Sequence, residues 1–191
     1  MIDAGSTQIG RLIQDLERAL TSQDCATDQV HCVAHLLEDF LGRPNLLEPR
    51  WTATREDHYA RHRVFVDPED RFCVVAMVWG PGQGTVIHDH GGVWCVEGVY
   101  QGKMHIVRYN LDHRDGDRCH FKRVEEITAG VGEVGNLIPP YEYHVMENLT
   151  EQPAVTLHVY GRELKSCRRY LPSEDGQCHV PFESPLRYDG E

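Results

Sequence analysis

Residues 82–102 read GQGTVIHDHGGVWCVEGVYQG, and residues 139–148 read PPYEYHVMEN. The first stretch places His88 and His90 at positions i and i+2, and the second supplies His144 within a turn rich in proline and aromatic residues. Because alternate side chains of a β-strand point to the same face, both rings of the first stretch can reach one metal ion. Neither Asp nor Glu stands where a fourth ligand would be expected. The three histidines therefore predict a metal site without a carboxylate ligand.

The bulk composition predicts a soluble protein that does not bind nucleic acid. The chain has 191 residues, 40% hydrophobic and 26% charged, and is long enough to bury a core. Its formal net charge of -11 argues against a nucleic-acid partner. Seven cysteines, an odd number without CxxC pairs, do not fit the disulfide framework of a small secreted fold. We see no signal peptide and no run of membrane-spanning length, so we expect a cytoplasmic protein without membrane contact.

Two segments with helical periodicity precede a region rich in short β-type runs. Ser6 or Thr7 can cap the first helix, and apolar residues recur at helical spacing in both segments. From about residue 51, β-rich runs alternate with turn residues, which is typical of a sandwich or a barrel. We expect a single domain over residues 1–191, with N-terminal helices at 1–50, a barrel at 51–162 and a C-terminal wrap at 163–191.

The spacing of the motif residues resembles that of the cupin superfamily. Residues 82–102 match its first motif, with Cys95 where the superfamily usually has glutamate, and residues 139–148 match its second motif, with Tyr141 replacing a glycine. The similarity extends over roughly residues 61–160. It implies a mainly β fold, the cupin jelly-roll barrel, with an N-terminal helical segment.

With Cys95 included, the chain resembles the thiol dioxygenases, which comprise cysteine dioxygenase and bacterial mercaptopropionate and mercaptosuccinate relatives. In that family three histidines bind ferrous iron, and the resemblance places them at His88, His90 and His144. Some members have cysteine at the glutamate position and others have glycine. The resemblance implies an oxidoreductase that transfers both atoms of O2 to a small carboxylate-bearing thiol, of the cysteine type, and gives a sulfinate.

The segment Thr156-x-His158-x-Tyr160 is similar to the Ser-x-His-x-Tyr motif of this family. Strand alternation puts the three side chains on one face, which suits a relay in which His158 orients the phenol of Tyr160 towards the metal pocket. In cysteine dioxygenases the matching tyrosine and cysteine can form a thioether, so Tyr160 and Cys95 are the candidates here. The alternative for His158 and Tyr160 is a buried polar pair without a chemical role.

Tyr59-x-Arg61 resembles the family's Tyr-x-Arg segment, whose arginine holds the substrate carboxylate. A guanidinium suits this task because its planar fork matches a carboxylate bidentately. Arg63 lies on the same face of the expected strand, and we favour Arg61 over it. An exposed surface position is the alternative for either arginine. Arg162 can add a second cationic contact, which would favour the binding of a dicarboxylate such as mercaptosuccinate.

The missing carboxylate ligand has a consequence for charge. Three neutral imidazoles leave a divalent metal its full positive charge, which favours anionic ligands and lowers the pKa of a bound thiol. Apart from Asp89, Glu97 is the only acidic residue shortly after His90. Its offset from the motif position is wrong by two or three residues, so we expect it not to bind the metal.

The sequence leaves the substrate and one other functional class open. 3-Mercaptopropionate or mercaptosuccinate is the alternative substrate, since Asp67-Pro68 and residues 79–83 look more like the bacterial mercaptocarboxylate branch. The alternative of another class is a non-catalytic cupin that binds a small acid. A carbon-oxidising cupin enzyme would normally require the missing glutamate. The oligomeric state does not follow from the sequence.

Overall fold

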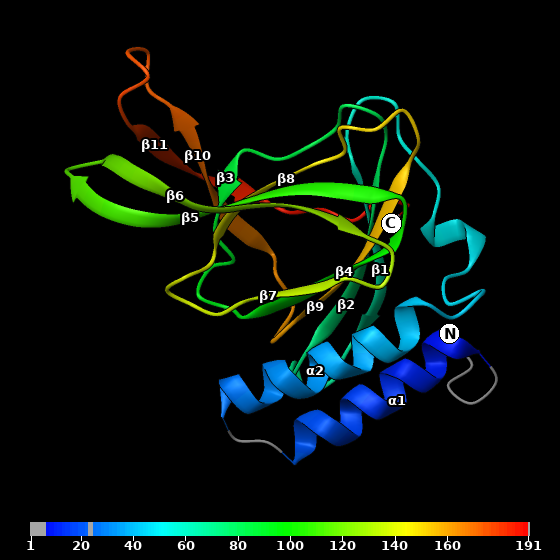
Figure 1. The fold of residues 1–191 in the computed structure, drawn as a ribbon. Coiled ribbons are helices and arrows are strands. Elements are labelled where there is room, and N and C mark those ends of the chain that lie inside the picture. The colour runs from blue at the N-terminus through cyan, green and yellow to red at the C-terminus, as the bar shows by residue number, and fades with distance from the viewer. Residues whose placement is uncertain (1–6, 23–24, 191) are drawn as a thin grey trace.

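The protein is described here by a computed structural model that covers residues 7–22 and 25–190. Two helices lie side by side under a body of strands (Figure 1). The helical elements are α1 (Gln8–Thr21), α2 (Ala26–Leu41) and the short 3-10 helix η1 (Pro49–Trp51). The strands are β1 (Ala60–Val66), β2 (Cys73–Trp79), β3 (Ile87–His88), β4 (Cys95–Gln101), β5 (Lys103–Asp115), β6 (Arg118–Gly130), β7 (Val134–Leu137), β8 (Tyr143–Glu147), β9 (Ala154–Tyr160), β10 (Ser166–Pro172) and β11 (His179–Pro185).

The two helices form as the sequence predicts. Thr7 Oγ1 accepts a hydrogen bond of 3.1 Å from the Gly10 backbone N–H and so caps α1, whereas Ser6 lies outside the described residues. The second helix ends at Leu41, directly before Gly42. Within the described residues, no helix combines the length and the apolar character needed to cross a membrane.

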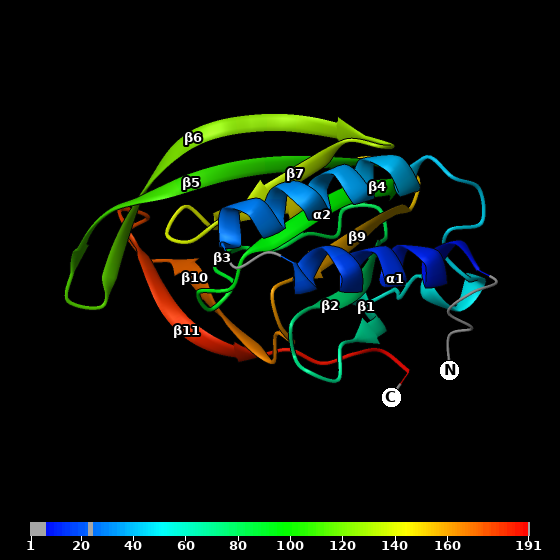
Figure 2. The ribbon, with the colours of Figure 1, turned by 90° about the horizontal axis from the view of Figure 1, so that it is seen from below.

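One sheet, in the order β1-β2-β9-β4-β7, carries the helices on its outer face (Figure 2). Strands β2 and β9 are buried at every position, so their alternate side chains serve two different cores. One set packs with the helices, for example Val74 and Val159. The other set, which includes Trp79 and Tyr160, points away from the helices into the body of strands. This alternation decides which residues of the sheet can reach an interior site.

The remaining strands follow one another in the order β10-β11-β6-β5-β8-β3 and close on themselves, because β3 pairs with both β8 and β10. The two facing sets of antiparallel strands with N-terminal helices confirm the mainly β jelly-roll fold. In Figure 1, the long β5–β6 hairpin extends beyond the rest of the body.

The structure differs from the sequence expectation in two places. The strand expected to carry both His88 and His90 forms only over the two residues of β3, so His90 lies in the loop after it. The tail beyond residue 162 is more than a wrap, because β10 and β11 form a hairpin that pairs with β3 and β6. A tail rich in proline, serine and charge conceals these strands because their alternation is weak.

The last glycine of the first motif is required by the backbone. Gly102 has φ +77°, and a Cβ there would lie 2.9 Å from both Ala154 Cα and Pro153 O. We expect Gly102→Ala to lower the free energy of unfolding by about 2–4 kcal/mol, the sum of left-handed strain and overpacking. Gly116→Ala is the matched control, because Gly116 has φ +62° and open space. Urea denaturation measures both, and equal losses would contradict the steric part of this prediction.

Candidate metal centre

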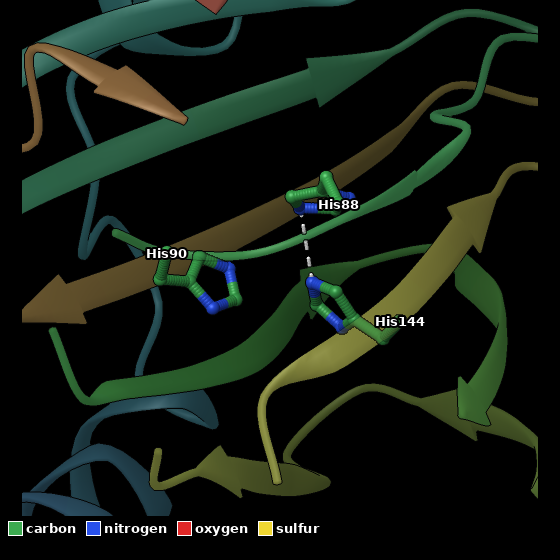
Figure 3. Close-up of side chains that lie close together, drawn as sticks. All are labelled: His88, His90 and His144. Carbon is green, nitrogen blue, oxygen red and sulfur yellow. Dashed lines mark hydrogen bonds between the residues drawn. The ribbon is translucent and has the colours of Figure 1, made fainter. Parts of the chain in front are cut away.

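The three predicted histidines converge on one point inside the body of strands (Figure 3). His88 on β3 and His144 on β8 are direct partners in the antiparallel pairing of these strands. Their Nε2 atoms lie 3.1 Å apart. The ring of His90 reaches the same place from the loop, with centroids 5.2 Å from His88 and 5.1 Å from His144. One nitrogen from each ring lies within 4.8 Å of the others.

The loop that carries His90 is held by two buried carboxylates. Asp89 accepts hydrogen bonds from the Arg168 backbone N–H at 2.8 Å and from the Tyr170 hydroxyl at 3.1 Å. Glu142 Oε2 accepts from the His90 backbone N–H at 2.8 Å and lies 3.9 Å from His90 Nδ1. The C-terminal hairpin and the second motif thus fix the direction of the His90 ring together.

The partners behind the rings decide which nitrogens can accept a metal. His88 Nδ1 lies 3.1 Å from the Val86 carbonyl oxygen, and His144 Nδ1 lies 3.4 Å from Glu97 Oε1. The Val86 carbonyl accepts the Nδ1 proton of His88, and the charge of Glu97 favours the tautomer of His144 with its proton on Nδ1, so each Nε2 can present a lone pair. Burial lowers the pKa of His88 to about 3. Burial is also the main reason that the pKa of His90 lies well below its usual range. Neutral imidazole is the form that binds a metal.

The facing lone pairs of His88 and His144 fit a metal ion. Two imidazole nitrogens 3.1 Å apart share a hydrogen bond when one of them carries the proton, and they fit a cation between them when both rings are protonated on Nδ1 (Figure 3). Imidazole nitrogens bind a divalent metal at about 2.0–2.1 Å, so two such nitrogens at right angles lie about 3 Å from each other. The observed separation matches that value. The donor set of three imidazoles suits iron, copper, nickel or zinc rather than magnesium or calcium.

The predicted relay residues are brought together on the interior face of β9. Trp79 Nε1 donates to Thr156 Oγ1 at 2.9 Å, and Thr156 Oγ1 lies 2.7 Å from His158 Nε2. The Tyr160 hydroxyl lies 3.4 Å from His158 Nδ1. Thr156, His158 and Tyr160 are each at most 2% exposed.

Cys95 lies opposite Tyr160 in the pairing of β4 with β9. Its Sγ is 3.9 Å from His158 Nδ1. Burial raises the pKa of the Cys95 thiol and of the Tyr160 phenol well above their usual ranges. Both groups are therefore protonated in this arrangement, and Cys95 occupies the motif position of the missing glutamate without facing the three histidines as a ligand.

The histidines open into a pocket that also contains Arg61. This side chain is 5% exposed, and its Nη1 donates to the Arg187 carbonyl oxygen at 3.2 Å. Among the described residues, its Nε and Nη2 have no hydrogen-bond partner, although both are buried. A buried guanidinium with two free donors is costly unless an anion meets them. The pocket therefore has the character of a site for an acid.

The other predicted arginines lie elsewhere. The Arg63 side chain is 44% exposed, lies 4.0 Å from Glu163 and does not line the pocket. Arg162 does not line it either. The sequence analysis missed Arg169, which lines the pocket and donates to the Tyr59 hydroxyl at 3.1 Å. Arg169 is the pairing partner of His88 on β10, so only a strand assignment in the tail would have found it.

Glu97 is also buried beside the site, at 3% exposure. Burial alone would raise the pKa of its carboxyl, but interactions with His144 and His158 hold that pKa well below its usual range. The carboxylate groups with Cys95 and His158 and not with the three histidines. Glu97 lies behind His144 and outside the three-histidine group, and that it is not a ligand of this site stays a prediction.

Most of this chain is similar to known proteins. A family model described as cysteine dioxygenase type I matches residues 6–173. Cysteine dioxygenase type 1 of Danio rerio is 25% identical over 162 residues, which covers 83% of this chain and 77% of that protein. The Homo sapiens protein of the same name is 26% identical over 165 residues, covering 84% and 79%. A solved structure from Thermus thermophilus has a TM-score of 0.47 and 21% identity, covering 59% of this chain and 91% of its own.

We expect His144→Ala to abolish stoichiometric binding of a divalent metal, because it removes one of two nitrogens that lie 3.1 Å apart. His105→Ala is the control. His105 lies on β5, the strand that pairs with β8 of His144, and its side chain contacts Glu126. Metal content after anaerobic Fe(II) loading and desalting measures the effect. One equivalent of iron retained by His144→Ala would contradict the three-histidine site.

Proposed function

This chain belongs to the cysteine dioxygenase type I family, and on that premise we propose that it oxidises a small carboxylate-bearing thiol of the cysteine type. Its membership makes it an oxidoreductase, a dioxygenase that transfers both oxygen atoms to a thiol. A non-catalytic acid-binding cupin is therefore not the function we retain. The observation that carries the proposal is the buried guanidinium of Arg61, which opens into the same pocket as the three histidines.

We propose that His88, His90 and His144 form the metal site and that the metal is ferrous iron. Iron supplies the redox chemistry that joins O2 to the sulfur of a thiol and yields a sulfinate. The protein contributes position and charge. Because all three ligands are neutral, the site favours an anionic substrate such as a thiolate. The hydrogen bond from His88 Nδ1 to the Val86 carbonyl keeps that ring from turning away when no substrate is present.

Arg61 binds the substrate carboxylate in this proposal. Its free Nε and Nη2 atoms are two donors of one planar fork, which is the arrangement that a carboxylate accepts bidentately. Because the Arg61 guanidinium is held at Nη1 by the Arg187 carbonyl oxygen, it is already oriented before substrate arrives. This pre-organisation lowers the entropy lost on binding. Because Arg61 and the three histidines line one pocket, a small thiol that carries a carboxylate can meet both.

Tyr160 donates a hydrogen bond to the substrate, and His158 positions it. The hydroxyl of Tyr160 is protonated, because burial raises its pKa, and its ring lies 5.8 Å from that of His90. A preformed donor in a water-poor pocket stabilises developing negative charge without reorganisation. Cys95 stands on the opposite strand, where a thioether with Tyr160 would lock the phenol. We keep this crosslink as part of the proposal.

Cysteine is the substrate that the relatives favour, since those reported above are cysteine dioxygenases. Arg169 supports a second candidate, mercaptosuccinate, because it adds a cation to the wall of the pocket. Its Nη2 is bound to Tyr59, and its other donors can meet a second carboxylate. 3-Mercaptopropionate, which has one carboxylate and no amine, tests whether the amine of cysteine contributes.

We expect Arg61→Gln to lower kcat/KM for L-cysteine by about 100-fold or more, because two charge-assisted hydrogen bonds are lost. Arg63→Gln is the matched control, since it removes the same charge two residues along the strand and outside the pocket. Oxygen uptake by the anaerobically Fe(II)-loaded protein measures both. Equal turnover by Arg61→Gln and the wild type would remove Arg61 from the substrate site.

The same oxygen-uptake assay, run with L-cysteine, 3-mercaptopropionate and mercaptosuccinate, identifies the preferred substrate. If the second carboxylate is recognised, mercaptosuccinate gives the highest kcat/KM, and Arg169→Gln lowers that value about tenfold or more while changing the value for cysteine little. If cysteine is preferred, Arg169→Gln leaves the order of substrates unchanged. No oxygen uptake with any small thiol would contradict the proposed function.

A further inference from the structure

The metal site and the relay described above are connected by one buried side chain, Glu97. Its Oε1 lies 3.4 Å from His144 Nδ1, and its Oε2 lies 3.3 Å from His158 Nδ1. Both imidazoles and the carboxylate are at most 3% exposed. A carboxylate taken out of water without partners costs several kcal/mol, so its place between two imidazoles requires an explanation.

The position of Glu97 follows from the alternation of β4. Cys95 and Glu97 point to the interior face, while Val96 between them packs towards the helices. In the pairing of β4 with β9, Glu97 lies directly opposite His158. It faces Nδ1 of His144, whereas Nε2 of that ring faces His88. The carboxylate is therefore a partner of a metal ligand and is not itself in the ligand set.

The hydrogen bonds of β9 favour one tautomer of His158. Trp79 Nε1 can only donate, so Thr156 Oγ1 accepts from it, and the hydroxyl's own proton can go to His158 Nε2, 2.7 Å away. His158 Nε2 is then an acceptor, and its ring proton is on Nδ1. That proton has two oxygen neighbours, Glu97 Oε2 at 3.3 Å and the Tyr160 hydroxyl at 3.4 Å. The carboxylate is the stronger acceptor of the two.

The other two histidines lack this connection to the relay. His88 Nδ1 has the neutral Val86 carbonyl as its partner, and His90 Nδ1 is 3.9 Å from Glu142. Glu97 is thus the carboxylate that faces both a proposed ligand and the residue that positions Tyr160. At 3.3–3.4 Å its pull on the two rings is mainly that of its charge.

We propose that Glu97 is a positioning residue that holds the Nδ1 protons of His144 and His158 at the same time. The inference rests on the proposed metal site. Through His144, Glu97 directs Nε2 of that ring to the metal. Its negative charge lies on the other side of the His144 ring from the metal. Through His158, it keeps the ring proton on Nδ1, so this nitrogen cannot accept the hydroxyl proton of Tyr160, and the phenol is free to donate that proton to the substrate.

Glu97→Gln tests this role, because the amide keeps the shape but loses the charge and one of the two acceptor oxygens. Glu147→Gln is the matched control, since Glu147 is a 43% exposed carboxylate on the strand that carries His144. We expect Co(II), titrated anaerobically into the apoprotein, to bind Glu97→Gln about 10–100-fold more weakly than the wild type. Glu147→Gln binds as the wild type does. An affinity of Glu97→Gln within about twofold of the wild type would overturn the proposal.

A second measurement locates the ring protons directly in the wild type and then compares them with those of Glu97→Gln. In the diamagnetic Zn(II)-loaded wild type, imidazole 15N chemical shifts and long-range 15N–1H correlations report which ring nitrogen carries the proton. We expect the proton on Nδ1 in both His144 and His158, and its transfer to Nε2 of His158 in Glu97→Gln. A wild-type His158 protonated on Nε2 would overturn the proposal, and a purely structural role for Glu97 would leave this tautomer unchanged.

The outcomes also separate this inference from the proposed function. One equivalent of Co(II) bound by the wild type, with weaker binding by Glu97→Gln, supports both the three-histidine site and the positioning role. A second equivalent that Glu97→Gln removes would mean that Cys95, Glu97 and His158 bind metal themselves, which overturns the positioning role alone. A wild type that binds metal but oxidises no thiol contradicts the proposed function and leaves the tautomer result intact.

Discussion

The site depends on two imidazole nitrogens that face each other across a single pair of strands. His88 and His144 are register partners of β3 and β8, and their Nε2 atoms are 3.1 Å apart, with the Val86 carbonyl behind His88 and Glu97 behind His144. When both rings are protonated on Nδ1, two lone pairs face each other, and this arrangement favours a bound cation. The strands that impose it are themselves held by the sheet that packs on the two helices and by the hairpin of the tail. Folding and metal binding therefore stabilise the same geometry.

Charge in the interior is arranged in opposite signs on the two sides of this pair. Arg61 faces the pocket with two free donors, and Glu97 stands behind His144. In the proposed function, a thiol substrate with a carboxylate brings negative charge to the pocket side, where Arg61 and the metal receive it. The buried carboxylate on the far side groups with His144, His158 and Cys95, so it does not compete for the arginine. Because the carboxylate and the arginine are separated, one small cavity can hold a cation, an anion and a metal. The carboxylate then does not neutralise the positive charge that attracts the substrate.

How much of this the sequence predicts depends on how local each relation is. His88, His90 and His144 were found because the motif spacing is fixed within short segments, although His90 reaches the cluster from a loop and not from a strand. Thr156, His158 and Tyr160 follow from strand alternation alone. Arg169 was missed because its place depends on the pairing of β10 with β3, two segments far apart in the chain. Arg61 and Arg63 have the same residue type, and the Tyr-x-Arg pattern favours Arg61 only as a resemblance, whereas burial separates the two directly.

Glu97 shows why an offset of two residues changes a role without removing it. Because the strand repeats every two residues, a carboxylate moved from position 95 to position 97 stays on the interior face but lies one step further along the strand. It leaves the coordination sphere and meets the back of His144 instead. A ligating glutamate would occupy a position on the metal, whereas this carboxylate supplies its charge through an imidazole and leaves that position open. The same step brings it opposite His158, so the charge that tunes the metal ligand also sets the direction of the phenol.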